Sequence, residues 1–325
     1  MKVLITGGGG FIGYRLARKL LERGTLAGPD GKPAPVTQIK LLDGAFPPDP
    51  DPRLVCVNGD LSAPGLIGEV LDRDTASVFH LAAVVSAGAE ADFDLGYRVN
   101  LDGTRFLLEA CRQLARPARL VFASSVAAFG GDLPDVLDDS TTPNPQTSYG
   151  TQKVIGEYLV TDFTRKGYLD GRSLRLPTIV VRPGKPNLAA SSFASSIFRE
   201  PLNGVVAECP VPERTGIWLL SPRQVVDAFI HAHDLAAPAW GMGRVLNLPG
   251  ITVTVSEGVG ALRRVAGDAV AARVQHKLDE RIDRIVQGWP VRVRTPRAIA
   301  MGFAADPDIE TVIRDYIADE GIRIR

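Results

Sequence analysis

The chain has 325 residues, of which 45% are hydrophobic and 23% are charged. At roughly 150 residues per domain, this length allows about two structural units whose cores need no disulfide or metal staple. Its 37 basic and 37 acidic residues cancel to a formal net charge of zero. Such a balance gives no broad positive field for a polyanion, so we expect no nucleic-acid partner.

Cysteine usage and hydropathy predict a cytoplasmic protein. The three cysteines are scattered, odd in number and outside any metal-ligand pattern, so we expect neither disulfides nor a metal site: Cys56, Cys111 and Cys209. Met1-Lys2 leads straight into the short apolar run Val3-Leu4-Ile5 without the features of a secretory leader. No apolar run approaches the ~18 residues of a membrane span. We therefore expect a reducing compartment and no membrane.

Short β-branched and aliphatic runs alternate with segments of helical period through the first half of the chain. This pattern predicts parallel strands covered by helices. Apolar spacing predicts helices over 12–23 and 99–114, where Cys111 falls on the buried stripe. The Gly- and Pro-rich segment 24–38 is expected to be an inserted surface loop. The predicted strands are 2–6, 39–42, 54–58, 77–81, 119–123 and 173–175.

Four glycines follow the first predicted strand and open the first predicted helix. They give the spacing G-x-x-G-x-x-G at Gly7, Gly10 and Gly13, with Phe11 and Ile12 at the start of the helix. Glycine permits positive φ in a tight turn and lets the backbone approach a pyrophosphate, which the N–H groups of the helix N-terminus stabilise. Because a strand and a helix flank the motif, a dinucleotide site is favoured over a flexible loop.

Carboxylates and small residues follow the next predicted strands. Asp43 is expected to accept hydrogen bonds from both ribose hydroxyls of an adenosine, although it could be an ordinary turn residue. A carboxylate there repels a 2′-phosphate, and Gly44-Ala45-Phe46 supplies no arginine, so NAD is favoured over NADP. Asp60, followed by Leu61, is either an adenine contact or a helix N-cap. His80 is interpreted as structural, and small residues after it would let the chain pass close to the dinucleotide, in the run Leu81-Ala82-Ala83.

Tyr149 and Lys153 lie four residues apart on a predicted helix and therefore share one face. An unperturbed phenol has a pKa of about 10, and a neighbouring ammonium and a nicotinamide cation would lower it toward that of a useful base. Ser125 ends the fifth predicted strand, at the carboxyl edge where such sheets bind ligands. Tyr-x-x-x-Lys alone also arises by chance on an amphipathic helix, but its combination with the glycine turn and the serine favours a catalytic set.

Together these residues resemble the extended short-chain dehydrogenases/reductases of the NAD-dependent epimerase/dehydratase group, over residues 1 to about 182. The resemblance implies that Tyr149 is the acid/base, that Lys153 holds the nicotinamide ribose, and that Ser125 binds the substrate oxygen. It implies that Asn100 supports the neighbouring helix or a proton-relay water, with a plain helix N-cap as the alternative. It also implies a homodimer that pairs through the Asn100 and Tyr149 helices.

After about residue 181 the composition shifts toward Pro, Ser, Asn and Gly, and helical periods return later, ending with the amphipathic stripe 309–317. The predicted fold is a doubly wound parallel α/β sheet of the Rossmann type with a smaller C-terminal cap. We expect an NAD-binding domain over 1–181, to which parts of 215–250 return, and a substrate-binding cap over 182–325. The alternating stretch Val291–Arg297 predicts a solvated strand face rather than a nucleic-acid patch.

The substrate class is inferred from the run that follows the sixth strand. No carboxylate follows Ser125, which disfavours dehydration, and the segment 174–187 departs from sugar-nucleotide epimerases. The run is similar to a subgroup that oxidises the C2 hydroxyl of four-carbon sugar acids with NAD, which implies conversion of D-erythronate to 2-dehydro-D-erythronate. Pro177 and Ile179 are expected beside the cofactor. The group from which the carboxylate and hydroxyl contacts are expected is Ser86, Thr178, Arg182, Lys185, Asn187 and Ser192.

Single members of that group have plain alternatives, because Arg182 could be a structural ion-pair partner and Lys185 a solvated charge. Two other functions also remain open. A sugar-nucleotide epimerase would use the same catalytic residues but return the hydride within one turnover. A redox-sensing module would use NAD(H) occupancy to control a partner, and such modules often lack the catalytic tyrosine or lysine that this chain retains.

Overall fold

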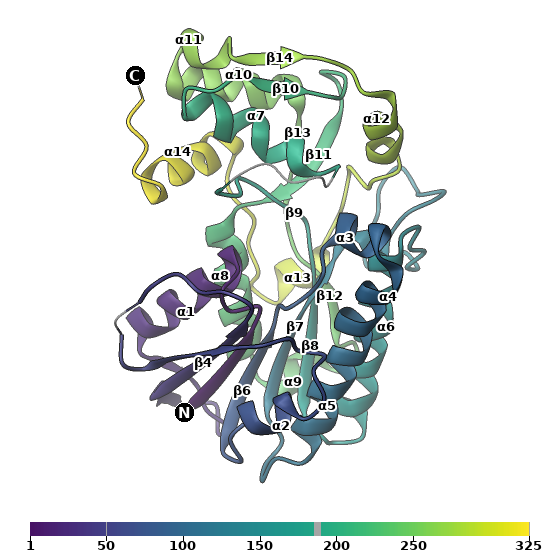
Figure 1. Ribbon diagram of the computed structural model, residues 1–325. Helices are drawn as coiled ribbons and strands as arrows, with labels where there is room; N and C mark the ends of the chain where they lie inside the picture. Colours follow the sequence, from purple (N-terminus) through teal and green to yellow (C-terminus); the bar gives the residue numbers. More distant parts are fainter. Residues whose placement is uncertain (50, 185–189, 325) are drawn as a thin grey trace. The chain divides into compact units, whose positions relative to one another are not determined.

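The computed structural model describes residues 1–49, 51–184 and 190–324. The chain forms two compact units (Figure 1). Unit 1 comprises 1–128, 145–175 and 226–247, and unit 2 comprises 129–144, 176–225 and 248–325. The expected functional limits, 1–181 and 182–325, remain a prediction, because compactness does not say which residues bind which ligand. No helix within the described ranges is long and apolar enough to span a membrane.

Unit 1 is built on a seven-stranded sheet in the order β12-β8-β7-β6-β1-β4-β5. β1 pairs in parallel with both β4 and β6, so the chain moves outward in one direction to β5 and then crosses to the other side of β1. This reversal makes the carboxyl ends of β1 and β6 the switch point, where such sheets bind ligands. The strands are β1 (Lys2–Thr6), β4 (Gln38–Asp43), β5 (Leu54–Asn58), β6 (Thr75–His80), β7 (Arg119–Ser125), β8 (Asp170–Leu176) and β12 (Val245–Asn247).

Helices cover both faces of this sheet. Leu107, Leu108 and Val160 pack against strand residues such as Val78 and Leu120 on one face. On the other side (Figure 1), Lys19 and Asp227 join α1 and α8 by an ion pair of 2.6 Å. The helices are α1 (Phe11–Arg23), α2 (Leu66–Val70), α3 (Ser86–Ala91), α4 (Phe93–Gly96), the π-helix η1 (Tyr97–Asp102), α5 (Gly103–Arg112), the 3-10 turn η2 (Val126–Ala128), α6 (Ser148–Arg165), α8 (Pro222–Asp234) and α9 (Ala237–Trp240).

The segment 24–38 is not the irregular loop that its composition predicts. Residues Thr25–Ala27 (β2) and Pro33–Pro35 (β3) form an antiparallel hairpin, whose turn places Gly31 at φ +77°. Leu26 is completely buried, and the Ala27 N–H donates to the Asp234 carboxylate at 2.8 Å. Tertiary burial therefore orders a segment that looks like a linker in the sequence.

Unit 2 has its own core of aliphatic and aromatic side chains from α7, β11, α10 and α14. The predicted strand over Val291–Arg297 is absent, because the backbone there makes only one bridge, between Val293 and Leu137, although Arg292 and Arg294 are exposed as expected. The elements are β9 (Thr178–Ile179), α7 (Ser192–Leu202), β10 (Ala207–Cys209), β11 (Gly216–Leu220), β13 (Ile251–Thr254), α10 (Val255–Ala266), α11 (Asp268–Ala271), β14 (Val274–His276), α12 (Glu280–Gln287), α13 (Pro296–Ala300) and α14 (Ile309–Asp319).

Candidate active site

The glycine turn between β1 and α1 is too tight for side chains. Gly7 has φ +71°, and a Cβ there would lie 2.7 Å from the Ala82 nitrogen; a Cβ on Gly13 would lie 2.2 Å from the Gly7 carbonyl oxygen. Gly10 is the N-cap of α1 and has no side chain to bond the first N–H groups of the helix. The turn thus presents bare backbone at a helix N-terminus, which fits a dinucleotide pyrophosphate.

Asp43 lies at the carboxyl end of β4, beside this turn. Its Oδ2 accepts from the Gly9 N–H at 3.0 Å and its Oδ1 from the Gly44 N–H at 2.7 Å. These bonds orient the carboxylate at the edge of the turn, where the adenosine ribose of a dinucleotide lies in such folds. The residues therefore fit the implied cofactor.

His80 is a structural histidine in a fully bonded site. One ring nitrogen is 2.7 Å from Thr6 Oγ1 and the other is 2.8 Å from Thr104 Oγ1. Burial and the charge of Lys153 lower the pKa of His80 to about 3, so the ring stays neutral. Thr6 Oγ1 also accepts from the Ala82 N–H at 3.3 Å, which holds the small residues after β6 beside the glycine turn.

Asn100 lies inside the π-helix η1, so it is not the helix N-cap that one interpretation predicts. Its Oδ1 accepts from the Val84 N–H at 2.8 Å and its Nδ2 donates to the Val84 carbonyl at 2.9 Å. The same Nδ2 donates to Gln152 Oε1 at 2.7 Å. Asn100 therefore ties the chain after β6 to α6, the helix that carries Tyr149 and Lys153.

The serine, tyrosine and lysine of the predicted catalytic set lie on β7 and α6 of unit 1. Thr147 caps α6 by accepting from the Gly150 N–H at 3.0 Å. Lys153 is only 3% exposed, which excludes the chance pattern of a tyrosine inside and a lysine outside. Its Nζ donates to the Ala123 carbonyl at 2.8 Å and lies 5.5 Å from the centre of the Tyr149 ring. The Ser125 hydroxyl, at the end of β7, accepts from the Ala127 N–H at 3.1 Å.

A buried ion pair between Glu157 and Arg175 lies beside β7 and α6. Glu157, one turn after Lys153 on α6, accepts from Arg175 Nε at 2.8 Å and Nη2 at 2.6 Å, and also from the Ser124 hydroxyl. Desolvation lowers the pKa of Lys153 to about 7, while the charge of Glu157 opposes that shift. The strand that carries Ser125 and the helix that carries Tyr149 are thereby locked together.

Some of the remaining predicted residues lie in unit 1, some lie in unit 2, and two lie outside the described residues. Asp60 accepts from the Ser62 N–H and hydroxyl, which lowers its pKa, and since α2 begins only at Leu66 it is not a helix N-cap. Leu61 is in the core of unit 1, whereas Ser86 opens α3. Pro177, Thr178, Ile179, Arg182 and Ser192 belong to unit 2, and Lys185 and Asn187 lie outside the described residues.

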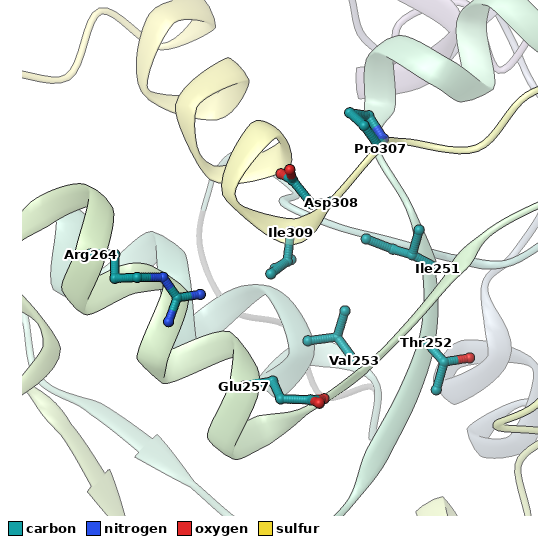
Figure 2. Close-up of a pocket in the computed structure, with 8 residues that line it drawn as sticks. All are labelled: Ile251, Thr252, Val253, Glu257, Arg264, Pro307, Asp308 and Ile309. Carbon is teal, nitrogen blue, oxygen red and sulfur yellow. The ribbon is translucent and has the colours of Figure 1, made fainter.

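Sequence reasoning missed the polar residues that brace the site. Thr6, Thr104, Gln152 and Glu157 are all buried and bond predicted site residues or their neighbours. Their only signal in the sequence is that a polar residue stands where the apolar spacing of the strand or helix predicts a buried side chain. A separate cavity of about 500 Å³ in unit 2 is lined by Ile251, Thr252, Val253, Glu257, Arg264, Pro307, Asp308 and Ile309 (Figure 2), and it contains none of the predicted residues.

The sheet order, the glycine turn and the oriented Asp43 define a Rossmann-type dinucleotide-binding protein. The family model described as the NAD dependent epimerase/dehydratase family matches residues 3–245. The chain belongs to this family, and its cofactor is NAD.

Similar proteins cover nearly the whole chain. It is 55% identical to a D-erythronate dehydrogenase of Cupriavidus necator over 99% of both chains. It is 45% identical to a D-erythronate dehydrogenase of Haemophilus influenzae, over 98% of this chain and 99% of that protein. Among solved structures, the nucleoside-diphosphate-sugar epimerase from Agrobacterium tumefaciens superposes with a TM-score of 0.93 at 41% identity, covering 100% of this chain and 96% of that one.

Proposed function

We propose that this chain is an NAD-dependent dehydrogenase that oxidises the C2 hydroxyl of D-erythronate to 2-dehydro-D-erythronate. The observation that carries the proposal is its identity of 55% and 45% to two D-erythronate dehydrogenases along both units, not along the dinucleotide-binding part alone. The buried Lys153 beside Tyr149 supports the acid/base role that we assign to Tyr149.

In this proposal Tyr149 removes the proton of the C2 hydroxyl, and Ser125 holds the same oxygen. Bound NAD supplies the hydride acceptor. Protonated Lys153, whose Nζ lies 5.5 Å from the centre of the Tyr149 ring, stabilises the phenolate of Tyr149 by charge attraction. Because Lys153 is buried, this attraction is weakly screened by water.

The carboxylate of the sugar acid requires donors, and we assign them to a set of basic and hydroxyl side chains, most of which belong to unit 2. Arg182 is the preferred member, since a guanidinium fork matches a carboxylate in charge and geometry. Thr178 and Ser192 offer hydroxyls from the same unit, and Ser86 offers one from α3. Lys185 and Asn187 complete the proposed set.

The test is to mix the purified protein with NAD and a panel of four- to six-carbon aldonates and uronates, beside UDP-sugars, and to follow nicotinamide absorbance. Stoichiometric NADH with D-erythronate is the expected result. The similarity to a solved nucleoside-diphosphate-sugar epimerase keeps one second candidate, the epimerase. Inversion of a UDP-sugar with no free NADH, and silence across the acids, would favour that activity instead.

We also propose a homodimer that pairs through α5 and α6, and a reducing, cytoplasmic compartment. Tyr158 on α6 is 68% exposed and Phe93 on neighbouring α4 is 58% exposed, both high for large apolar side chains. Cys56, Cys111 and Cys209 are free cysteines. Light scattering should give twice the chain mass, and Tyr158→Glu should give the monomer mass; a monomeric native protein would contradict the pairing.

A further inference from the structure

The backbone that leads into Arg182 is held firmly within unit 2. Val180 donates its N–H to the Leu220 carbonyl of β11 at 3.0 Å. Val180 and Val181 are completely buried, in one cluster with Phe193 and Ile197 of α7. Arg182 comes next and is half-buried.

α7 bonds both polar groups of the Arg182 backbone. The Ser195 hydroxyl oxygen accepts from the Arg182 N–H at 3.0 Å, and Arg199 Nη1 donates to the Arg182 carbonyl at 2.9 Å. Ser195 and Arg199 are four residues apart, so they lie on one face of the helix. Both are buried, at 2% and 6% exposure, so neither side chain reaches a ligand in solvent.

Arg199 is an expensive group to bury, and its neighbours offset its charge. Its Nη2 donates to Glu200 Oε1 at 2.7 Å and to Ser196 Oγ at 3.1 Å. A buried ion pair adds little net stability compared with apolar residues of the same volume. The contact that an apolar residue could not provide is the charge-assisted bond to the Arg182 carbonyl.

We propose that Ser195 and Arg199 are positioning residues that fix the backbone of Arg182, so that its guanidinium meets the substrate carboxylate. This inference rests on the proposed function, in which Arg182 binds that carboxylate. Ser195 and Arg199 act through Arg182 and touch no reacting atom. They therefore affect substrate binding and leave the hydride-transfer step unchanged.

The kinetic test compares Arg182→Met, Ser195→Ala, Arg199→Met and Arg199→Lys, with Ser256→Ala, at an exposed serine on α10 of the same unit, as the control. We expect Arg199→Met to raise the KM for D-erythronate about tenfold and Ser195→Ala to raise it about threefold, with kcat and the Kd of NADH within about twofold of the native values. Arg199→Lys should recover part of the loss, because an ammonium still donates to the carbonyl. Ser256→Ala should keep the native KM.

A double variant tests whether Arg199 acts through Arg182. If it does, R182M/R199M has the same KM as R182M alone, because the effects of coupled residues do not add. If Arg199→Met multiplies KM equally in both backgrounds, the positioning role is overturned while the proposed function stands.

Hydrogen exchange of the full-length chain supplies a readout that needs no substrate. The amide of Arg182 should exchange faster in Ser195→Ala and Arg199→Met than in the native protein and in Ser256→Ala. Unchanged exchange would overturn the positioning role even if no sugar acid yielded NADH. Faster exchange, together with no NADH from any sugar acid, would support the bonds of Ser195 and Arg199 to the Arg182 backbone and would reject the proposed function.

Discussion

The ammonium of Lys153 is buried between α6 and β7, and burial lowers its pKa to about 7. A lysine that only solubilised a helix would face water and keep its ordinary charge. This lysine instead donates to the Ala123 carbonyl and lies over the rings of Phe122 and Tyr149. Its placement fits the base that we propose for Tyr149, since a buried cation beside a phenol favours the phenolate.

The phenol of Tyr149 is therefore the group whose removal should stop the reaction. Tyr149→Phe should lower kcat by at least about a hundredfold, because general-base catalysis contributes 10²–10⁴-fold, while the Kd of NADH stays near its native value. Tyr158→Phe, on the exposed face of the same helix, is the matched control and should be fully active. Turnover that survived in Tyr149→Phe would contradict the role of Tyr149 as the base, whereas a redox-sensing module would keep its control of a partner in this variant.

The carboxylate of Asp43 should set the choice between NAD and NADP. Asp43→Asn keeps the size of the side chain but removes the charge that repels a 2′-phosphate. We expect the ratio of kcat/KM for NAD over NADP to fall about tenfold or more, measured with both cofactors at fixed ionic strength. Asp74→Asn, which removes a carboxylate paired with Lys2 elsewhere in unit 1, should leave the ratio unchanged. If the NAD/NADP ratio of kcat/KM were unaltered in Asp43→Asn, Asp43 would be an ordinary turn residue that does not select the cofactor.

At the scale of elements, the π-helix η1 depends on Asn100. Asn100→Ala would leave the Val84 N–H, the Val84 carbonyl and Gln152 Oε1 without their present partner. At roughly 1–3 kcal/mol for each unsatisfied buried group, partly relieved by local rearrangement, we expect a loss of about 2–4 kcal/mol in unfolding free energy. Urea denaturation measures it, with Asn58→Ala as an exposed control. Equal unfolding free energies for Asn100→Ala and the native protein would show that the three hydrogen bonds make no net contribution to stability.

Most strands of the seven-stranded sheet follow from the sequence because they are short apolar runs, which are largely buried in β1, β6 and β7 and only partly buried in β5. The predicted 2–6 and 54–58 are the observed β1 and β5, four other predicted strands differ by a few residues at their ends, and β12 is not among the predicted strands. Three further features escape that reasoning. The β2–β3 hairpin depends on burial of Leu26, and α7 passes through a Ser- and Pro-rich stretch and includes Pro201. The π-helix η1 contains Asn100, which bonds Val84 across 16 residues of the chain, and no local pattern reveals that partner.

The candidate site likewise contains some residues that the sequence reveals and others that only the fold reveals. Gly7, Asp43, Tyr149 and Lys153 are visible in the sequence, because the chemistry fixes their type and spacing. The groups that hold them, such as Gln152 and Glu157, are not, because a buried polar residue is recognised only once its partner is known. Hydrogen-bond partners far apart in the chain are a property of the fold rather than of any local pattern.

On the scale of the whole chain, two buried histidines hold opposite ends of the central strand β6. His80 joins the carboxyl end to β1 and α5 through Thr6 and Thr104, and His233 bonds Ser77 near the other end at 2.8 Å. Burial is the main cause that lowers the pKa of His80 to about 3 and that of His233 to about 4. Both rings are therefore neutral in the folded protein at pH values where the unfolded chain binds protons.

Because each folded pKa lies below the unfolded value of about 6.5, stability is retained above pH 6.5 and is lost as the pH falls toward 4. Each ring that stays neutral should remove about 1.4 kcal/mol of unfolding free energy per pH unit in that window. Urea midpoints measured from pH 7.5 to 4.5 test this expectation. His233→Gln should flatten the slope by about half, whereas His276→Gln, which removes an exposed histidine, should not change it. If His233→Gln did not change the slope of unfolding free energy against pH, protonation of His233 beside β6 would not be a cause of the acid instability.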